Sequence, residues 1–387
     1  MTSGNQYAAG QYRDTLSWSR SSFGDSLGDP ELTSPGPEQQ ITTAPTWRPP
    51  SDKADFVSVV TAISNAYQCG QYLKMRSLNK IEWDELGSGR YFQVSRSNLE
   101  FEVISSTSQT TTKRVLEQFV IKRSRENDIK MMNAKENAKF VHELRILDHL
   151  RHQPHIVELK GIAWFYYHDD DLKPCPRPVF LLERATKTLE SLILETDSLD
   201  PKFMISMLFE ISSGLQIMHN AGIVHGDVKP DNILLFPRFA IHESAIEGYS
   251  AKLSDFSHAI LQPPAGEMLS FHGGTPGYVA PELPGRVTWE QLKLTDVWSL
   301  GMLISVVVSQ SFEFRNLARD GMDTDELIQI IHTSFRHNVD NSAMSIRRSQ
   351  LMQDLCSCTL QKDAASRHLD RVVQSFEEYL QPEIKHG

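Results

Sequence analysis

A polar stretch at residues 225–232 constrains this chain more than any other feature of its sequence. It contains a histidine, two aspartates, a lysine and an asparagine. The segment before it repeats apolar residues every three or four positions up to Gly222, which predicts a buried helix, and the apolar run 233–235 after it predicts a strand. Polar side chains concentrated between two buried elements are typical of a loop that carries chemistry. Composition alone also allows a solvated connector.

The pattern around this stretch changes from strands to helices along the chain. A helix is predicted over residues 134–150, and the chain becomes helical again from Pro201 onward. A β-rich first part followed by a helix-rich second part predicts an α+β fold with two lobes. The predicted strands of the first part are residues 91–94, 99–104, 119–122 and 179–182.

The segments outside this dense pattern differ in composition. Residues 1–50 hold six of the nineteen prolines and few apolar residues, so we predict a disordered tail. Residues 51–79 are predicted to be an N-terminal extension with a short helix that docks on the main domain, and residues 376–387 a short C-terminal tail. The predicted helix rests on apolar residues at helical spacing: Phe56, Val59, Val60 and Ile63.

Composition and charge exclude several classes of protein. With 40% hydrophobic and 23% charged residues, the chain can bury a sizeable core. Its net charge of −10 argues against nucleic acid as the primary partner. The apolar stretch 297–308 is too short for a membrane span, and the first ten residues lack a secretory pattern. Four scattered cysteines do not form a disulfide framework, so we expect an intracellular protein, in the cytoplasm or nucleus.

Three further motifs follow the polar stretch. Asp255-Phe256-Ser257 comes 23 residues after Asn232, and Gly-Thr-Pro-Gly-Tyr-Val-Ala-Pro-Glu (274–282) and Asp-Val-Trp-Ser-Leu-Gly (296–301) come next. In this order and spacing, the motifs resemble those of the eukaryotic protein kinase family, serine/threonine type. The resemblance covers residues 80–375. It implies a bilobal protein kinase fold, with a β-rich N-lobe at 80–183 and a mainly helical C-lobe at 186–375.

The resemblance gives the polar stretch a catalytic role, and the chemistry of its residues agrees. Phosphoryl transfer requires positioning and charge neutralisation more than covalent chemistry. Asp227 would accept the proton of the attacking hydroxyl, and Lys229 would stabilise the migrating phosphoryl charge. Asn232 and Asp255 supply oxygen ligands of the kind that Mg²⁺ prefers.

A glycine-rich loop over the phosphates of ATP is implied further upstream. Gly87, Ser88 and Gly89 match its start, and glycines there let the backbone approach phosphate oxygens closely. Gly-x-Gly alone is common in ordinary turns, but here it lies between predicted strands, with Val94 at the expected distance. Phe92 stands where the family has its third glycine.

An ion pair is implied between Lys122 and Glu143. Lys122 ends a predicted strand, and Glu143 lies beside the apolar stripe of the helix 134–150, where an acid without a partner is costly. The resemblance makes Lys122 the ligand of the α- and β-phosphates. It also implies an adenine site, with Leu182 as gatekeeper. The remaining residues of that site are Glu183 and Ala185 of the hinge and Val94, Val120 and Leu234 around the base.

Three other matches are structural by resemblance. Arg367 would pair with Glu282, Asp296 would tether the catalytic loop, and Thr275 would lie near Asp227. Together with Lys229, Thr275 favours serine or threonine over tyrosine as the acceptor.

The leading hypothesis is an enzyme that uses ATP and Mg²⁺ to phosphorylate Ser/Thr hydroxyls of protein substrates. Three departures from the family keep a non-catalytic kinase-like scaffold open: Phe92 for glycine, Gly226 for arginine and Ser257 for glycine. None of them removes a charge or a metal ligand. A small-molecule kinase is a third hypothesis, because His-Gly-Asp with Asn five residues later also occurs there. The segment 274–282 argues against it.

Overall fold

The structure is a computed structural model that describes most of the chain from Phe56 onward. The described residues are 56–66, 71–75, 84–88, 92–96, 100–105, 112–115, 119–124, 134–168, 174–238, 248–264, 266–271, 273–283, 285–337 and 343–381. The predicted tail 1–50 lies outside them, and so does Gly89 of the predicted glycine-rich loop.

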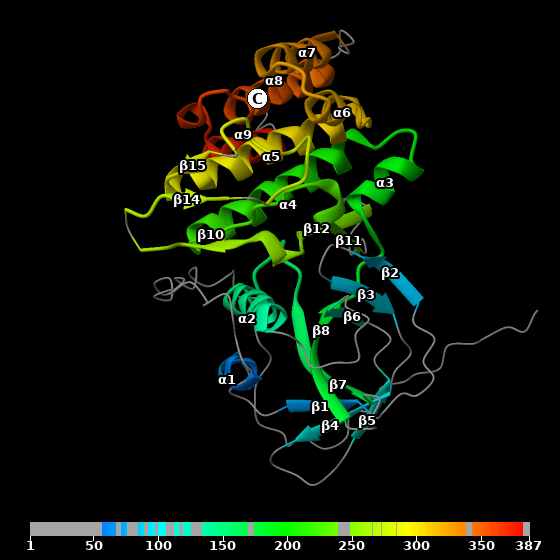
Figure 1. The fold of residues 1–387 in the computed structure, drawn as a ribbon. Helices are drawn as coiled ribbons and strands as arrows, with labels where there is room; N and C mark the ends of the chain where they lie inside the picture. The colour runs from blue at the N-terminus through cyan, green and yellow to red at the C-terminus, as the bar shows by residue number, and fades with distance from the viewer. Residues whose placement is uncertain are drawn as a thin grey trace, which may run out of the picture. The chain divides into compact units, whose positions relative to one another are not determined.

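The first half of the described chain builds one eight-stranded sheet, with strand order β2-β3-β6-β8-β7-β1-β4-β5 (Figure 1). Its longest pairing is the antiparallel one between β7 and β8. The strands are β1 (Gln71–Met75), β2 (Asp84–Ser88), β3 (Phe92–Arg96), β4 (Glu100–Ser105), β5 (Thr112–Val115), β6 (Phe119–Ser124), β7 (Leu159–His168) and β8 (Pro174–Glu183).

The sheet contains an arrangement that the sequence does not predict. β4 forms within one residue of its predicted position, but β3 pairs directly with β6, and β4 lies beyond β7. There it pairs with β1, which also pairs in parallel with β7. β1 precedes residue 80, so the sheet of the N-lobe begins inside the predicted extension 51–79. β1 alternates too little between polar and apolar residues to be predicted as a strand.

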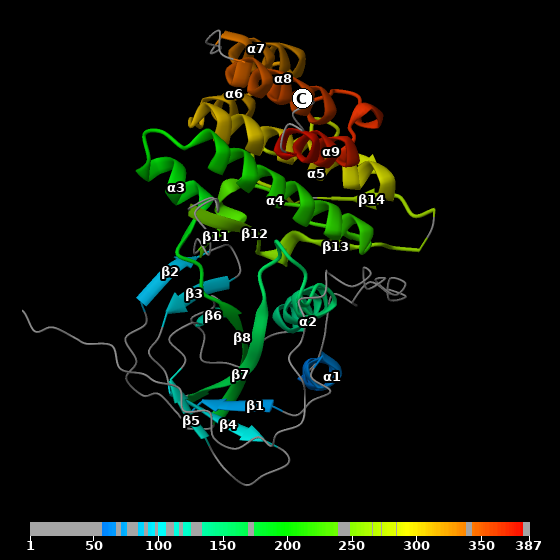
Figure 2. The ribbon, with the colours of Figure 1, turned by 180° about the vertical axis from the view of Figure 1, so that it is seen from behind.

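Within the described residues, two helices accompany the sheet, α1 (Phe56–Ala66) and α2 (Ala134–His149). On α2, Phe140 stacks on Phe180 of β8, with ring centroids 4.3 Å apart. α1 packs against α2, as Figure 2 shows from behind. Val59 and Ile63 of α1 are buried in the main core. Val60, which shares the predicted stripe, is exposed.

The second half is mainly helical and packs around α5 (Trp289–Ser309). A capping box between Thr288 and Gln291 begins α5. By length and composition α5 could cross a membrane, but 72% of its most apolar window is buried inside the protein, as expected of a central core helix. The other helices are α3 (Leu189–Glu195), α4 (Pro201–Asn220), α6 (Glu313–Arg319), α7 (Thr324–His337), α8 (Ala343–Thr359) and α9 (Leu369–Leu380). α9 therefore runs into the predicted tail 376–387.

Short strands and 3-10 turns connect these helices. β11 (Ile233–Arg238) pairs with β12 (Gly248–Leu253) along its full length, from Ile233↔Leu253 to Arg238↔Gly248. Residues 237–238 and 248–250 therefore belong to this hairpin. The remaining pieces are β9 (Lys187–Thr188), β10 (Ile223–Val224), β13 (Ile260–Leu261), β14 (Leu269–Ser270), β15 (Arg286–Val287) and the turns Pro230–Asn232, Phe256–His258 and Ala364–Ser366.

Candidate active site

The loop 225–232 lies between the short strand β10, which follows α4, and β11. It is almost entirely buried. Asp296 of α5 holds its start. The Oδ2 of Asp296 accepts a hydrogen bond from the backbone N–H of His225 (2.7 Å), and its Oδ1 accepts one from Gly226 (2.9 Å). Nε2 of His219 lies 3.0 Å from the same carboxylate. The prediction that Asp296 tethers this loop is confirmed.

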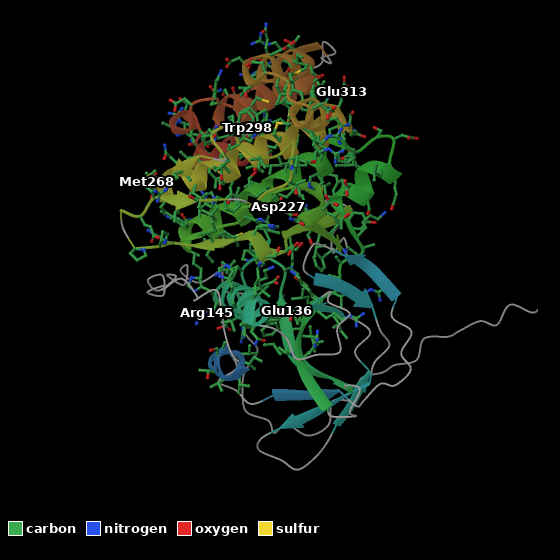
Figure 3. The ribbon with its side chains drawn as sticks, viewed as in Figure 1. Glu136, Arg145, Asp227, Met268, Trp298 and Glu313 are labelled. Carbon is green, nitrogen blue, oxygen red and sulfur yellow. The ribbon has the colours of Figure 1, made fainter. Side chains whose placement is uncertain are left out.

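Asp227, labelled in Figure 3, makes several polar contacts with side chains of this loop and with Thr275. Its Oδ1 accepts a hydrogen bond from Oγ1 of Thr275 (2.8 Å), and its Oδ2 accepts one from Nδ2 of Asn232 (3.1 Å). Nζ of Lys229 lies 3.1 Å from Oδ2 and donates to Thr275 at 2.8 Å. These three side chains hold the Asp227 carboxylate, so its orientation is set before a substrate binds.

A second cluster joins the sheet to the segment after β12. Nζ of Lys122 donates to Oε1 of Glu143 at 2.5 Å and to Oδ1 of Asp255 at 2.9 Å. Lys122 and Glu143 are 5% and 2% exposed, whereas Asp255 is 35% exposed. Asp255 has a left-handed backbone, with φ 59°. The predicted pair Lys122–Glu143 is present, and Asp255 extends it to a triad.

Burial and charge act in opposite directions in this triad. Burial alone would lower the pKa of Lys122, but the carboxylates of Asp255 and Glu143 outweigh it and raise that pKa. Burial also raises the pKa of Glu143, which Lys122 offsets only in part. For Asp255 the burial effect is overcome by the charge of Lys122 and by hydrogen bonds from Lys122 and Ser257, so its pKa lies well below the usual range. Lys122 and Asp255 are therefore both charged at neutral pH.

Asn232 and Asp255 fit the proposed Mg²⁺ site by their donor chemistry. Asn232 uses its Nδ2 to donate to the backbone oxygen of Asp227 (2.8 Å) and to its carboxylate, so its Oδ1 is the remaining polar atom. Asn232 directly precedes β11, and Asp255 follows the end of β12 by two residues. Ser254, between β12 and Asp255, donates to the backbone oxygen of Asn232. They would supply one amide and one carboxylate oxygen. Among the described residues, no group of three His, Cys, Asp or Glu side chains offers a separate metal site.

Most of the predicted residues around the nucleotide that the structure describes lie on β2, β3, β6, β8 and β11 or in the linker after β8. Gly87 and Ser88 end β2 and pair with Val94 and Gln93 of β3. Val94 lies opposite Lys122 of the neighbouring β6, so the strand that follows the predicted loop lies beside the lysine predicted to bind phosphate. Val94 and Leu234 are partly buried and Val120 is buried, and all three belong to one apolar cluster.

The predicted hinge is held at its first residue. The backbone N–H of Glu183 donates to the carbonyl of Glu158, and its carboxylate accepts from the backbone of Glu158 and from Lys252, both at 2.7 Å. Thr186, just after Ala185, donates its N–H to Leu235 of β11 (2.8 Å). The linker between the two halves is thus fixed on both sides of Ala185.

Three contacts at this site are not predictable from the motifs. They are the direct bond from Lys122 to Asp255, the bond from Ser257 to Asp255, and the position of His258, whose Nδ1 lies 3.9 Å from Asp227 Oδ2. Ser257 departs from the family's glycine, yet its hydroxyl supports the ionised Asp255. The sequence places Ser257 and His258 close to Asp255, but this proximity does not predict which groups their side chains contact.

We expect Glu143→Gln to reduce kcat/KM for ATP by about tenfold or more. Glutamine keeps the size of the side chain but removes the charge that orients Lys122, and a hydrogen bond to a charged group contributes about 1.5–3 kcal/mol. Steady-state kinetics with varied ATP measure the effect. Glu136→Gln, on the first turn of the same helix, is the matched control. An unchanged kcat/KM would show that Asp255 alone orients Lys122.

The sheet and helical half, with the Asp227 loop and the Lys122 triad, define the class of proteins with the bilobal protein kinase fold. The family model of the protein kinase domain matches residues 103–376, more than half of the chain. The chain therefore belongs to the protein kinase family.

Curated relatives agree with this assignment over a shorter stretch. Mitogen-activated protein kinase HOG1 of Saccharomyces cerevisiae is 30% identical over 167 residues, which are 43% of this chain and 33% of the relative. HOG2 of Zygosaccharomyces rouxii is 31% identical over 167 residues (43% and 34%), and sty1 of Schizosaccharomyces pombe is 30% identical over 167 residues (43% and 41%). The chain spans about a third to two fifths of the length of these relatives.

Proposed function

We propose that this protein is a serine/threonine protein kinase that transfers the γ-phosphoryl group of ATP to Ser/Thr hydroxyls of protein substrates. The observation that carries the proposal is the set of contacts around Asp227, which Thr275, Asn232 and Lys229 hold by direct hydrogen bonds or ion pairing. A fixed carboxylate beside a cation is the arrangement that phosphoryl transfer to a hydroxyl requires.

In the proposed reaction, Asp227 orients the acceptor hydroxyl and takes its proton as the oxygen bonds to the γ-phosphorus. The bond from that phosphorus to the β–γ bridging oxygen breaks, and ADP leaves. Lys229 neutralises charge on the phosphoryl group during transfer, and Lys122, held by Glu143, binds the α- and β-phosphates. Asn232 and Asp255 would hold Mg²⁺, which would neutralise charge on the phosphate oxygens.

The alternative of a non-catalytic scaffold rests on Phe92, Gly226 and Ser257. All the charged residues that the reaction needs remain, and Ser257 supports Asp255. A small-molecule kinase is disfavoured by the segment around Thr275, whose far end is anchored by the pair Glu282–Arg367. Such an ordered segment beside Asp227 suits a peptide acceptor better than a small molecule.

The test is incubation of the purified protein with labelled ATP, Mg²⁺ and a library of Ser/Thr peptides. Tyrosine peptides and a panel of small-molecule alcohols serve as comparison acceptors. Transfer to Ser/Thr peptides alone supports the proposal. Transfer to small alcohols alone would support the third hypothesis, and binding of ATP without transfer would support the scaffold.

The names of the relatives describe mitogen-activated protein kinases. Together with the net charge of −10, they support protein substrates rather than nucleic acid, and an intracellular location in the cytoplasm or nucleus. Imaging of the tagged chain, with a catalytically silent variant as control, would test the location.

A further inference from the structure

An aromatic side chain is buried in the segment that leads to Thr275. Phe271 is 7% exposed, although the residues around it are mostly small or polar. Its ring belongs to an apolar cluster that is separate from the main core. The other buried members of this cluster are Val224, Val287, Trp289 and Leu292.

The ring also lies against the backbone of the catalytic loop. A Cβ added to Gly226 would lie 2.9 Å from Cζ of Phe271 and 2.6 Å from the carbonyl oxygen of His258. A Cβ added to Gly273 would lie 2.4 Å from the same Cζ. Gly226 also has φ +77°, which other residues rarely adopt. Two glycines thus form the slot that the ring fills, and one of them is directly bonded to Asp227.

The same segment is anchored on both sides of this slot. Before it, β13 pairs with β10, with Val224 opposite Ile260, and β14 pairs with β15. After it, Thr275 donates its hydrogen bond to Asp227. Phe271 directly follows β14 and precedes Thr275 by four residues, so its packing determines where the chain goes between the two anchors.

We propose that Phe271 is a positioning residue, which holds residues 269–271 and 273–275 on the catalytic loop by packing its ring over Gly226. Gly226 has no side chain and so cannot hold this segment by an ion pair. The ring of Phe271 holds the segment there by apolar contact instead. We therefore expect the segment to keep this position without a phosphate group. This inference rests on the proposed kinase function for its kinetic readout only.

The kinetic test compares Phe271→Ala with Phe271→Leu. We expect Phe271→Ala to lower kcat for a Ser/Thr peptide by about tenfold or more, while KM for ATP stays within about twofold, because the Lys122 triad is untouched. Phe271→Leu should recover most of the rate, since it refills the slot. Phe335→Ala is the matched control: Phe335 of α7 is equally buried and belongs to the main core. It should lower the melting temperature without changing kcat at a permissive temperature.

Hydrogen exchange gives a readout that does not need activity. Amides of residues 269–271 and 273–275 should exchange faster in Phe271→Ala than in the wild type, and Phe335→Ala should leave them unchanged. Treatment of the wild type with a broad phosphatase should leave its initial rate within about twofold. Unchanged exchange, an unchanged kcat in Phe271→Ala, or a phosphatase effect above about tenfold would each overturn the inference. A wild type that transfers no phosphate would refute the proposed function, while exchange would still test Phe271.

Discussion

Asp227→Asn is expected to lower the rate of phosphoryl transfer at least about a hundredfold, the low end for loss of a general base. Asparagine matches the shape of aspartate, so it can keep one of the bonds from Thr275 and Asn232. Its amide cannot take the proton of the acceptor hydroxyl, and the attraction to Lys229 is lost. The melting temperature should change little, because the loop is still held by Asp296.

The measurement is single-turnover transfer from labelled ATP to a Ser/Thr peptide, with a thermal melt of the same preparation. Asp231→Asn makes the same change four residues along the same loop, at an exposed side chain, and should transfer at close to the wild-type rate. If Asp227→Asn and Asp255→Asn both retained near wild-type turnover, the catalytic hypothesis would be wrong and the scaffold would replace it.

Arg367→Met should lower the free energy of unfolding by about 3–5 kcal/mol. Arg367 is 1% exposed, and its guanidinium donates to both oxygens of Glu282, at 2.6 and 2.9 Å. It also donates to the carbonyls of Gln361 and Leu294. Methionine fills much of the volume but leaves the Glu282 carboxylate and the backbone carbonyls without this donor.

Denaturant unfolding of both proteins measures the difference. Arg319→Met is the control, because Arg319 is half exposed and its ion pair with Asp320 is of the surface kind that contributes about 0–1 kcal/mol. The double variant Arg367→Met/Glu282→Gln should lose less than the sum of the single changes, since removal of the Glu282 charge relieves part of the defect. A loss below about 1 kcal/mol in Arg367→Met would show that the pair does not stabilise the C-lobe.

The residues predicted to meet at the site do so where the chain itself limits their separation. Asp227, Lys229 and Asn232 lie within six residues of one another, and a loop between two buried elements leaves few ways to arrange them. Lys122 and Glu143 meet because a buried acid on α2 requires a cation, and β6 supplies one. For these contacts, the spacing along the chain or the cost of burying a charge is enough to predict the partner.

The remaining features depend on pairings between distant residues. Nothing in the sequence of β4 indicates that it pairs with β1 rather than with β3. Strand pairing is determined by tertiary contacts that the local pattern does not encode. Phe271 has no periodic neighbours that would mark it as buried. Its environment is made by Gly226 and by β15, which lie 45 residues before and about 15 residues after it.

The packing of α1 on α2 links the N-terminal extension to the ion pair between Lys122 and Glu143. If α2 moves Glu143 away from Lys122 while α1 stays in place, Val59 and Ile63 of α1 become exposed. Exposure of two such side chains costs about 3–6 kcal/mol. That cost favours the state in which Glu143 pairs with Lys122 over the separated state by a ratio on the order of 10²–10⁴. A helix that precedes the matched kinase domain would thus act as a built-in bias on a two-state equilibrium inside it.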